Sequence, residues 1–219
     1  MDTITPAAPL TRRGFFSPAL WRPSNVTNSK PAASSQPAIH HEDGDFETRL
    51  VDGRLASHVR WPAFALVDHR GRAVDLHRDI IAGHNVVLSF FYTQCKGSCP
   101  VTTSRMTDLA EVLGTQGRAA RFISITLEPE EDTPAVLAEY ARDVLPAAAD
   151  WHLLTGAKDT ITALRRHLGF YDLNPAIDAD PRRHAAMVLM GNDSTHRWIT
   201  LPAISSLRQW RSALSRCAA

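Results

Sequence analysis

The sequence predicts an α/β three-layer sandwich, in which a mixed central sheet with an antiparallel edge hairpin lies between two layers of helices. Two observations carry this prediction. Short apolar runs typical of buried strands alternate with segments whose apolar residues recur at helical spacing. The chain then ends on two strand-like runs around a turn and one more amphipathic segment. Alternating strands and helices require parallel pairing with right-handed crossovers, whereas a terminal hairpin adds an antiparallel edge.

The first half of the predicted domain contains two short strands, one long apolar run and a helix. Phe64–Val67 and Ala73–Leu76 flank a turn. Asn85–Thr93 reads NVVLSFFYT, and a run this apolar is typical of a strand covered on both faces. After Pro100, apolar residues at i, i+3, i+4 and i+7 predict an amphipathic helix that Gly114 ends. These apolar residues are Met106, Leu109, Ala110 and Leu113.

The second half repeats the alternation and then ends on a hairpin and a helix. Arg121–Leu127 and Trp151–Thr155 are the next two predicted strands. The helix between them has Pro134 at its first position, with Asp132 or Thr133 as its cap. A further helix, the hairpin and a last helix follow. They are marked by Ile161, Leu164 and Leu168 before Gly169, by HAAMVLM (184–190) and HRWITL (196–201) around GNDST, and by Ile204, Leu207, Trp210 and Leu214.

The first 45 residues do not share this pattern. They are rich in Pro, Ser, Ala and Asn and lack periodicity, so we expect residues 1–45 to form a disordered leader and residues 46–219 to form the folded domain. TRRGFF (11–16) is similar to a twin-arginine export signal, but Pro18, Arg22 and Pro23 interrupt the apolar segment that such a signal needs. We therefore expect neither a signal peptide nor a membrane anchor in the leader.

The composition argues against several classes of function. The chain of 219 residues has 24 basic and 23 acidic residues and a net charge of +1. This balance, without a dense basic block, gives no electrostatic basis for nucleic-acid binding. No stretch reaches the ~20 consecutive apolar residues of a membrane-spanning helix, so we expect no transmembrane helix. Three cysteines do not make a disulfide scaffold.

Two of the three cysteines lie together where the predicted apolar strand ends. Cys95 and Cys99 stand four positions apart in CKGSC, and sulfurs at this place in an α/β sandwich are typical of the thioredoxin-like fold. The start of a helix favours thiolate over thiol. Gly97 lets the loop bend, and Ser98 can cap the helix. The spacing suits either a disulfide or a shared metal ion, for which two thiolates favour Cu(I) or Zn(II).

A metal site needs a third ligand from elsewhere in the chain, because two thiolates do not complete it. His184 opens the predicted strand HAAMVLM directly after the polar loop NPAIDADPRR. In this fold that loop returns over the end of the sheet where the cysteines lie, so His184 is the candidate third ligand. We interpret His152 and His167 as structural, and we assign no role to Cys217, which we expect at a frayed helix end.

Four stretches in this order, VVLSFFYTQCKGSCP, ISITLEPEEDTPAVLAEYA, WHLLTG and RRHAAMVLMGND, resemble the Sco/SenC family of copper-delivery proteins over about residues 60–215. The resemblance implies a thioredoxin-like fold that binds one copper ion, Cu(I) or Cu(II), per monomer through Cys95, Cys99 and His184. It also implies copper insertion into the binuclear copper site of a terminal respiratory oxidase, whose copper-accepting subunit is then the partner. Because family members are typically anchored or exported, it further implies a periplasmic or membrane-associated location.

Two residues near the site depart from the family's pattern. Glu128 stands where the family usually has an Asp, and Arg183 precedes His184 where the family often has an Asp. The second change removes a carboxylate next to the expected ligand. Both leave copper binding intact and allow it to be retuned.

Three functions remain open. The preferred one is a copper metallochaperone, which binds and transfers copper and is not an enzyme. The second is a thiol-disulfide reductase of the acceptor's cysteines, with Cys95 and Cys99 as the redox disulfide. A third, a peroxiredoxin-like peroxidase, has slight support from CPVTTSR with Arg105. His184 distinguishes them, because a chaperone needs it and a pure dithiol reductase does not.

Overall fold

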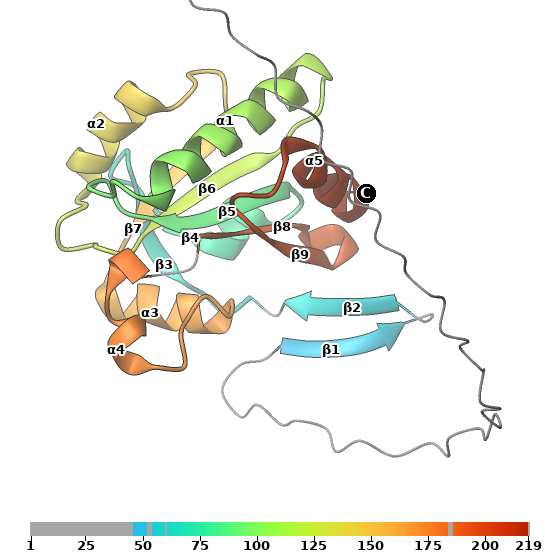
Figure 1. Ribbon diagram of the computed structural model, residues 1–219, viewed down its shortest axis with the longest axis horizontal. Coiled ribbons are helices and arrows are strands. Elements are labelled where there is room, and N and C mark those ends of the chain that lie inside the picture. Colours follow the sequence, from blue (N-terminus) through green and yellow to red (C-terminus); the bar gives the residue numbers. More distant parts are fainter. Residues whose placement is uncertain (1–45, 52–53, 60, 184–185, 219) are drawn as a thin grey trace, which may run out of the picture. The chain divides into compact units, whose positions relative to one another are not determined.

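The computed structural model describes residues 46–51, 54–59, 61–183 and 186–218, and Figure 1 shows their arrangement. The expected leader lies outside the described residues. A mixed sheet of seven strands has the order β4-β3-β7-β6-β5-β8-β9. Its strands are β3 (Ala65–Asp68), β4 (Ala73–Asp75), β5 (Asn85–Phe91), β6 (Arg121–Thr126), β7 (Trp151–Thr155), β8 (Met187–Asn192) and β9 (Arg197–Pro202).

The pairing of these strands confirms the predicted mixed sheet. Strands β5, β6 and β7 pair in parallel. Strand β8 runs antiparallel to β5 and β9 runs antiparallel to β8, which makes the predicted edge hairpin. At the other edge, β3 lies antiparallel to both β7 and β4. Because β5 and β6 are parallel, the loops that follow them leave from the same edge of the sheet.

Helices cover both faces of the sheet and complete the three layers (Figure 1). One face packs against α1 (Ser98–Thr115), α2 (Pro134–Val144) and α5 (Leu207–Cys217), and the other against the short π-helix η1 (Leu76–Ile81) and α3 (Lys158–His167). Along β5, Val87 and Phe91 join the first core and Val86 and Leu88 the second. This alternation shows why the apolar run is unbroken: both faces of the strand are buried.

The segment between α3 and β8 contains two short helices that the sequence did not predict. They are α4 (Pro175–Asp178) and the 3₁₀-helix η2 (Pro181–Arg183). Another 3₁₀ turn, η3 (Asp193–Thr195), joins β8 to β9. A hairpin of β1 (Phe46–Val51) and β2 (Arg54–Val59), also not predicted, forms a separate two-stranded sheet. None of the helices in the described part is long and apolar enough to span a membrane.

Two expectations for the last helix were wrong. Ile204 does not belong to its apolar stripe: it is 82% exposed and precedes the helix. Ser206 caps α5 through a reciprocal pair of bonds with Gln209, which sets the helix start after Ile204. Cys217 does not lie at a frayed end either, since it is fully buried in the last turn of α5 and its thiol faces the Met190 carbonyl at 3.8 Å. The apolar spacing continues through the last turn and holds it in the core.

The expected strand Ala73–Leu76 also ends early, because its last residue begins η1. Asp75 caps this π-helix by accepting from the Arg78 N–H, and Leu76 becomes fully buried in the core under the sheet. The run of apolar residues is thus shared between a strand and a helix.

Candidate functional site

The loop that carries the cysteines leaves the carboxyl end of β5 and is held there by a buried carboxylate. Asp132 is 1% exposed and accepts from the Thr93 N–H at 3.1 Å, from the Thr93 hydroxyl and from the Thr126 hydroxyl. It therefore ties the ends of β5 and β6 to the start of α2. Sequence reasoning treated Asp132 as a rival cap for α2, but Thr133 caps that helix through the Val136 N–H.

The structure brings Cys95 and Cys99 together as free thiols. Cys99 is 3% exposed and lies in the first turn of α1, whereas Cys95 is half-buried in the loop before it. The helix starts at Ser98 and not at Pro100, which fits within a first turn because its missing N–H has no helical partner there. Ser98 is therefore not the cap: Gly97 occupies that position and makes no side-chain capping bond.

The sulfur of Cys95 accepts hydrogen bonds from N–H groups at the start of α1, as a capping side chain would. Burial raises the pKa of Cys95, but hydrogen bonds from the Cys99 thiol, from the N–H groups of Cys99 and Gly97 and from the Tyr92 hydroxyl outweigh it and bring the pKa below its ordinary value. Donors at a helix start stabilise a thiolate in this way.

Cys99 behaves in the opposite way. Its burial, its hydrogen bond to Cys95 and the negative charge of Cys95 raise its pKa to about 12. The pKa of Tyr92 also rises to about 12, through burial and its hydrogen bond to Cys95. These opposite shifts favour a thiolate at Cys95 and a thiol at Cys99 that donates to it. Cys95 is the sulfur that meets a reagent or a metal first.

Cys95 borders two cavities of about 420 Å³ each. The first contains charged groups, since Lys96, Glu128 and Arg182 line it. The second lies between α1 and α2, and Cys99 and Tyr140 line it as well. Cys95 is thus open to one side that is lined by charged groups and to another that has none.

The polar loop between α3 and β8 returns to the cysteines as the sequence predicted. Arg182, in η2, lines the same cavity as Cys95. His184 itself lies outside the described residues, so the structure leaves its predicted role as third ligand open. The described residues resume at Ala186, whose carbonyl accepts from the Ala203 N–H at 2.8 Å. No group of three or more His, Cys, Asp or Glu within the described part is arranged to hold a metal ion.

The two residues that depart from the family's pattern line different cavities. Glu128 lines the charged cavity, and its pKa is raised by burial and by the charges of Asp132 and Glu131. Arg183 borders a separate cavity of about 350 Å³ together with Arg165. Of the two, Glu128 shares a cavity with Cys95, whereas the cavity that Arg183 borders contains neither cysteine.

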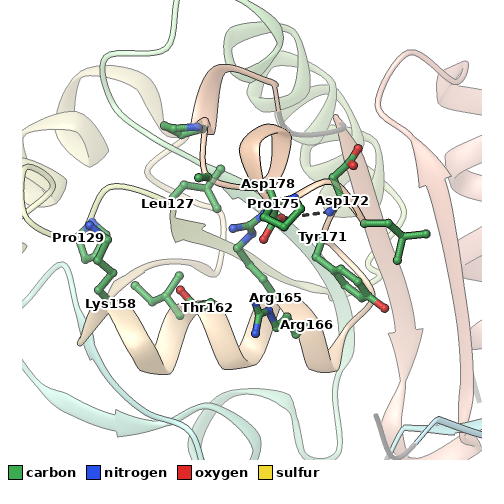
Figure 2. Close-up of a pocket in the computed structure, with 14 residues that line it drawn as sticks. Leu127, Pro129, Lys158, Thr162, Arg165, Arg166, Tyr171, Asp172, Pro175 and Asp178 are labelled. Carbon is green, nitrogen blue, oxygen red and sulfur yellow. Dashed lines mark hydrogen bonds and ion pairs between the residues drawn. The ribbon is translucent and has the colours of Figure 1, made fainter. Parts of the chain in front are cut away.

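Sequence reasoning missed one ion pair beside the loop. Figure 2 shows Arg165 of α3 pointing to Asp178 of α4, at the edge of a cavity of about 890 Å³. The two charged groups are 2.5 Å apart and their side chains are 13% and 12% exposed. The sequence shows an arginine in a predicted helix and an aspartate in the loop that follows. No local pattern indicates that the two side chains pair.

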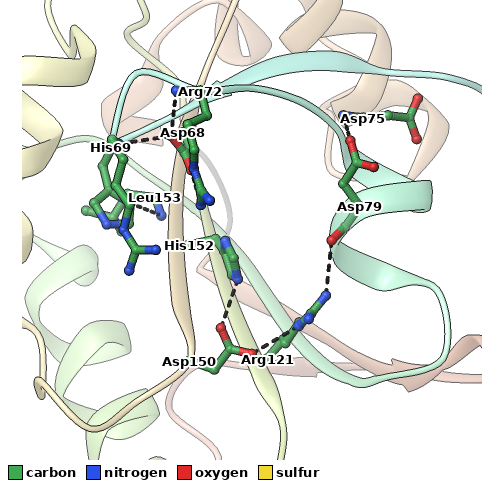
Figure 3. Close-up of polar contacts among 10 residues, drawn as sticks. Asp68, His69, Arg72, Asp75, Asp79, Arg121, Asp150, His152 and Leu153 are labelled. Atoms are coloured by element: carbon green, nitrogen blue, oxygen red, sulfur yellow. Dashed lines mark hydrogen bonds and ion pairs between the residues drawn. The ribbon is translucent and has the colours of Figure 1, made fainter.

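The histidines interpreted as structural lie away from the sulfurs. His152 stands at the amino end of β7, where its Nε2 bonds Asp150 at 2.9 Å (Figure 3). His167 ends α3 and packs its ring against Trp61 and Phe64. The carboxyl end of β5, from which Cys95 follows, is the opposite edge of the parallel strands.

A thioredoxin-like sandwich with two reduced cysteines between a central strand and the helix after it defines a class of proteins that act through paired sulfurs. Within this class the family is shown directly. The SCO1/SenC family model matches residues 54–214, and the chain belongs to that family.

Individual relatives agree with this assignment. The SCO1 protein homolog of Bacillus subtilis is 31% identical over 93 residues, which are 42% of this chain and 47% of the relative. The chain spans about half the length of the curated relatives that it matches.

Solved structures show the same fold at low sequence identity. BsSco, described as a member of the Sco family of cytochrome c oxidase assembly proteins with a disulfide switch, matches with a TM-score of 0.60 at 21% identity, over 73% of this chain and 94% of that one. Copper-bound ScoI of Bradyrhizobium japonicum matches with a TM-score of 0.57 at 22% identity, over 72% of this chain and 98% of that one.

Proposed function

We propose that this protein is a copper metallochaperone that delivers copper to the binuclear copper site of a terminal respiratory oxidase or a related copper enzyme. The observation that carries the proposal is the reduced pair of Cys95 and Cys99, of which Cys95 is thiolate-prone and accessible. The membership in the SCO1/SenC family supports it, as do the copper bound to the related ScoI and the description of BsSco as an oxidase assembly protein.

In this proposal one copper ion per monomer is held by Cys95, Cys99 and His184. Two thiolates and an imidazole suit Cu(I) in a three-coordinate site. Binding displaces the proton of Cys99, because a metal takes the thiolate form of its ligand. The same set, with its imidazole, also accommodates Cu(II).

Transfer needs ligands that leave one at a time. Cys95 borders both cavities and Cys99 only one, so an incoming cysteine of the acceptor meets the copper on the Cys95 side first. The acceptor's thiolates then replace those of the chaperone stepwise. The partner is accordingly the copper-accepting subunit of the oxidase, and the location is the periplasm or a membrane surface.

A dithiol reductase is the second candidate, because the split between the pKa values of Cys95 and Cys99 suits thiol-disulfide exchange. The Cys95 thiolate attacks a disulfide of the acceptor and releases one acceptor thiolate. Cys99 loses its proton and attacks the mixed disulfide, which releases the second thiol and leaves Cys95 and Cys99 oxidised. The peroxidase reading has less support, since Arg105 is not among the residues that line either cavity at the cysteines.

The test loads the protein with one equivalent of Cu(I) and adds the soluble domain of a copper-accepting oxidase subunit in its reduced, copper-free form. We expect copper to move to the acceptor from the wild type and to be poorly held and poorly transferred by His184→Ala. A chaperone requires this outcome. Equal reduction of an oxidised acceptor by wild type and His184→Ala, with no copper transfer by either, would instead establish the reductase.

A further inference from the structure

Residues 170–183, here called the connecting segment, lead from the end of α3 to the residue before His184. The segment contains two helices of one turn or less, α4 and η2. Helices this short are not stable by themselves. Their position must therefore be set by contacts with the rest of the domain.

One side chain of α3 makes those contacts at two points. Arg165 donates through Nε to the Phe170 carbonyl at 3.2 Å and through Nη2 to Asp178 at 2.5 Å. The same Asp178 oxygen accepts from the Asp172 N–H at 3.1 Å. Arg165 thus binds the start of the connecting segment directly and its middle through Asp178 (Figure 2).

Further hydrogen bonds hold the part of the connecting segment that follows Asp178, up to the cavity at Cys95. The Asp180 N–H donates to the Ile177 carbonyl at 3.2 Å, and the Arg183 N–H donates to the Asp180 carbonyl at 2.9 Å. Arg182 pairs with Asp180 at 2.9 Å and lines the Cys95 cavity. Hydrogen bonds and the short stretches of backbone between them therefore connect α3 to the residue that precedes His184.

The burial of the pair makes its role specific. Both side chains are almost nine-tenths buried, so either charge can be accommodated here only while its partner is in place. The next residue along α3, Arg166, is exposed and lines only the outer cavity. Arg166 carries the same charge as Arg165 and lies on the same helix, so its substitution is a matched control for loss of Arg165.

We infer that Arg165 and Asp178 are positioning residues for the copper site: their ion pair holds the connecting segment so that Arg182 borders the Cys95 cavity and Arg183, which precedes the proposed ligand His184, has a fixed position. The inference rests on the proposed function, because it assigns a role toward a copper ligand. It adds a pair of residues, distant in sequence from all three ligands, that sets the affinity of the site.

The experiment measures Cu(I) affinity of the full chain by competition with bicinchoninate, for wild type, Asp178→Asn, Arg165→Gln and Arg166→Gln. Loss of a residue that orients a ligand typically weakens metal binding by 10–100-fold, so we expect a loss of about tenfold for Asp178→Asn and Arg165→Gln and none for Arg166→Gln. Thermal unfolding of the copper-free proteins shows which variants are folded. Asp178→Asn keeps the shape of the side chain and is the decisive variant where Arg165→Gln does not fold.

A second measurement separates positioning from general support of the fold. In a His184→Ala background, Asp178→Asn should cause no further loss of Cu(I) affinity, because the ligand that it orients is gone. The same tenfold loss in that background would overturn the inference, and so would wild-type affinity of folded Asp178→Asn. A wild-type protein that binds no copper would overturn the proposed function and this inference with it, whereas normal copper binding by all variants would overturn this inference alone.

Discussion

The two ends of the central sheet hold their polar residues in different ways. At the amino end of the parallel strands, polar side chains pair with one another: Arg121 binds Asp150, which also binds His152, and at the neighbouring turn Asp68 binds Arg72 (Figure 3). At the carboxyl end, a hydrogen-bonded group such as Asp132 is buried below the surface. The sulfur of Cys95, in contrast, borders open cavities.

This difference separates polar residues that only support the fold from those that lie at the candidate site. Asp68 and Asp132 are both buried carboxylates with several donors, at 0% and 1% exposure. Asp68 closes the turn after β3 by accepting from the N–H groups of Arg70 and Arg72. Asp132 holds the strand end from which the reactive loop departs. A buried carboxylate with several hydrogen-bond donors therefore supports a turn at Asp68 and the candidate site at Asp132.

The largest expected effect at the cysteine end is complete loss of Cu(I) binding on oxidation. Diamide should convert the two thiols of Cys95 and Cys99 to a disulfide and itself be reduced to the hydrazine, and a disulfide offers no thiolate to copper. Mass spectrometry of the alkylated, digested protein should find the Cys95–Cys99 peptide pair. A main product that contains Cys217 would contradict the account, since that thiol is buried in α5.

Removal of the two buried carboxylates sharpens the comparison. Asp132→Ala and Asp68→Ala should each lower the free energy of unfolding by about 3 kcal/mol, because buried donors lose their acceptor. Only Asp132→Ala should also change the alkylation rate of Cys95 in the folded protein. Urea unfolding and iodoacetamide kinetics measure the two effects, with exposed Asp108→Ala as the control. Equal alkylation rates of Cys95 in Asp132→Ala and Asp68→Ala would contradict the distinction between the two ends of the sheet.

A smaller effect is expected from the hydrogen bond between Tyr92 and Cys95. Tyr92→Phe removes a donor to the thiolate, so the pKa of Cys95 should rise and its alkylation rate at pH 7 should fall by about fivefold, given ~1 kcal/mol for the bond. The rate should increase with pH in both proteins, with the midpoint at higher pH in Tyr92→Phe. An unchanged midpoint would show that the Tyr92 hydroxyl does not contribute to the lowered pKa of Cys95.

No effect on the site is expected from loss of the leader. A chain that begins at Asp45 should fold and bind copper with unchanged stoichiometry, because every predicted strand and helix follows Phe46. Metal analysis after gel filtration checks this. A shortened chain that folds but binds no copper would assign the leader a part in the site.

Much of the fold was predictable because its signals are local. The apolar run of β5, the helical spacing of Met106 to Leu113 and the pair of Cys95 and Cys99 are all read within short windows. Ile204 was misplaced because a single apolar residue fits a helical spacing that the cap at Ser206 excludes. The burial of Cys217 depends on packing of α5 against β8, which no window of sequence contains.

The supports of the site were not predictable for the same reason. Asp132 and Thr93 are 39 positions apart, and Arg165 and Asp178 meet only because the connecting segment folds back on α3. Their side chains have no distinctive local pattern. The sequence indicated the candidate ligands, but the residues that support them are set by tertiary contacts.

The central claim, that Cys95, Cys99 and His184 form one copper site, is tested most directly by the copper content of purified, reconstituted protein. We predict one copper per monomer for wild type and for Cys217→Ala, weakened binding for His184→Ala, and none for Cys95→Ser/Cys99→Ser, in which neither soft ligand remains. Stoichiometric copper retained by Cys95→Ser/Cys99→Ser would contradict the account.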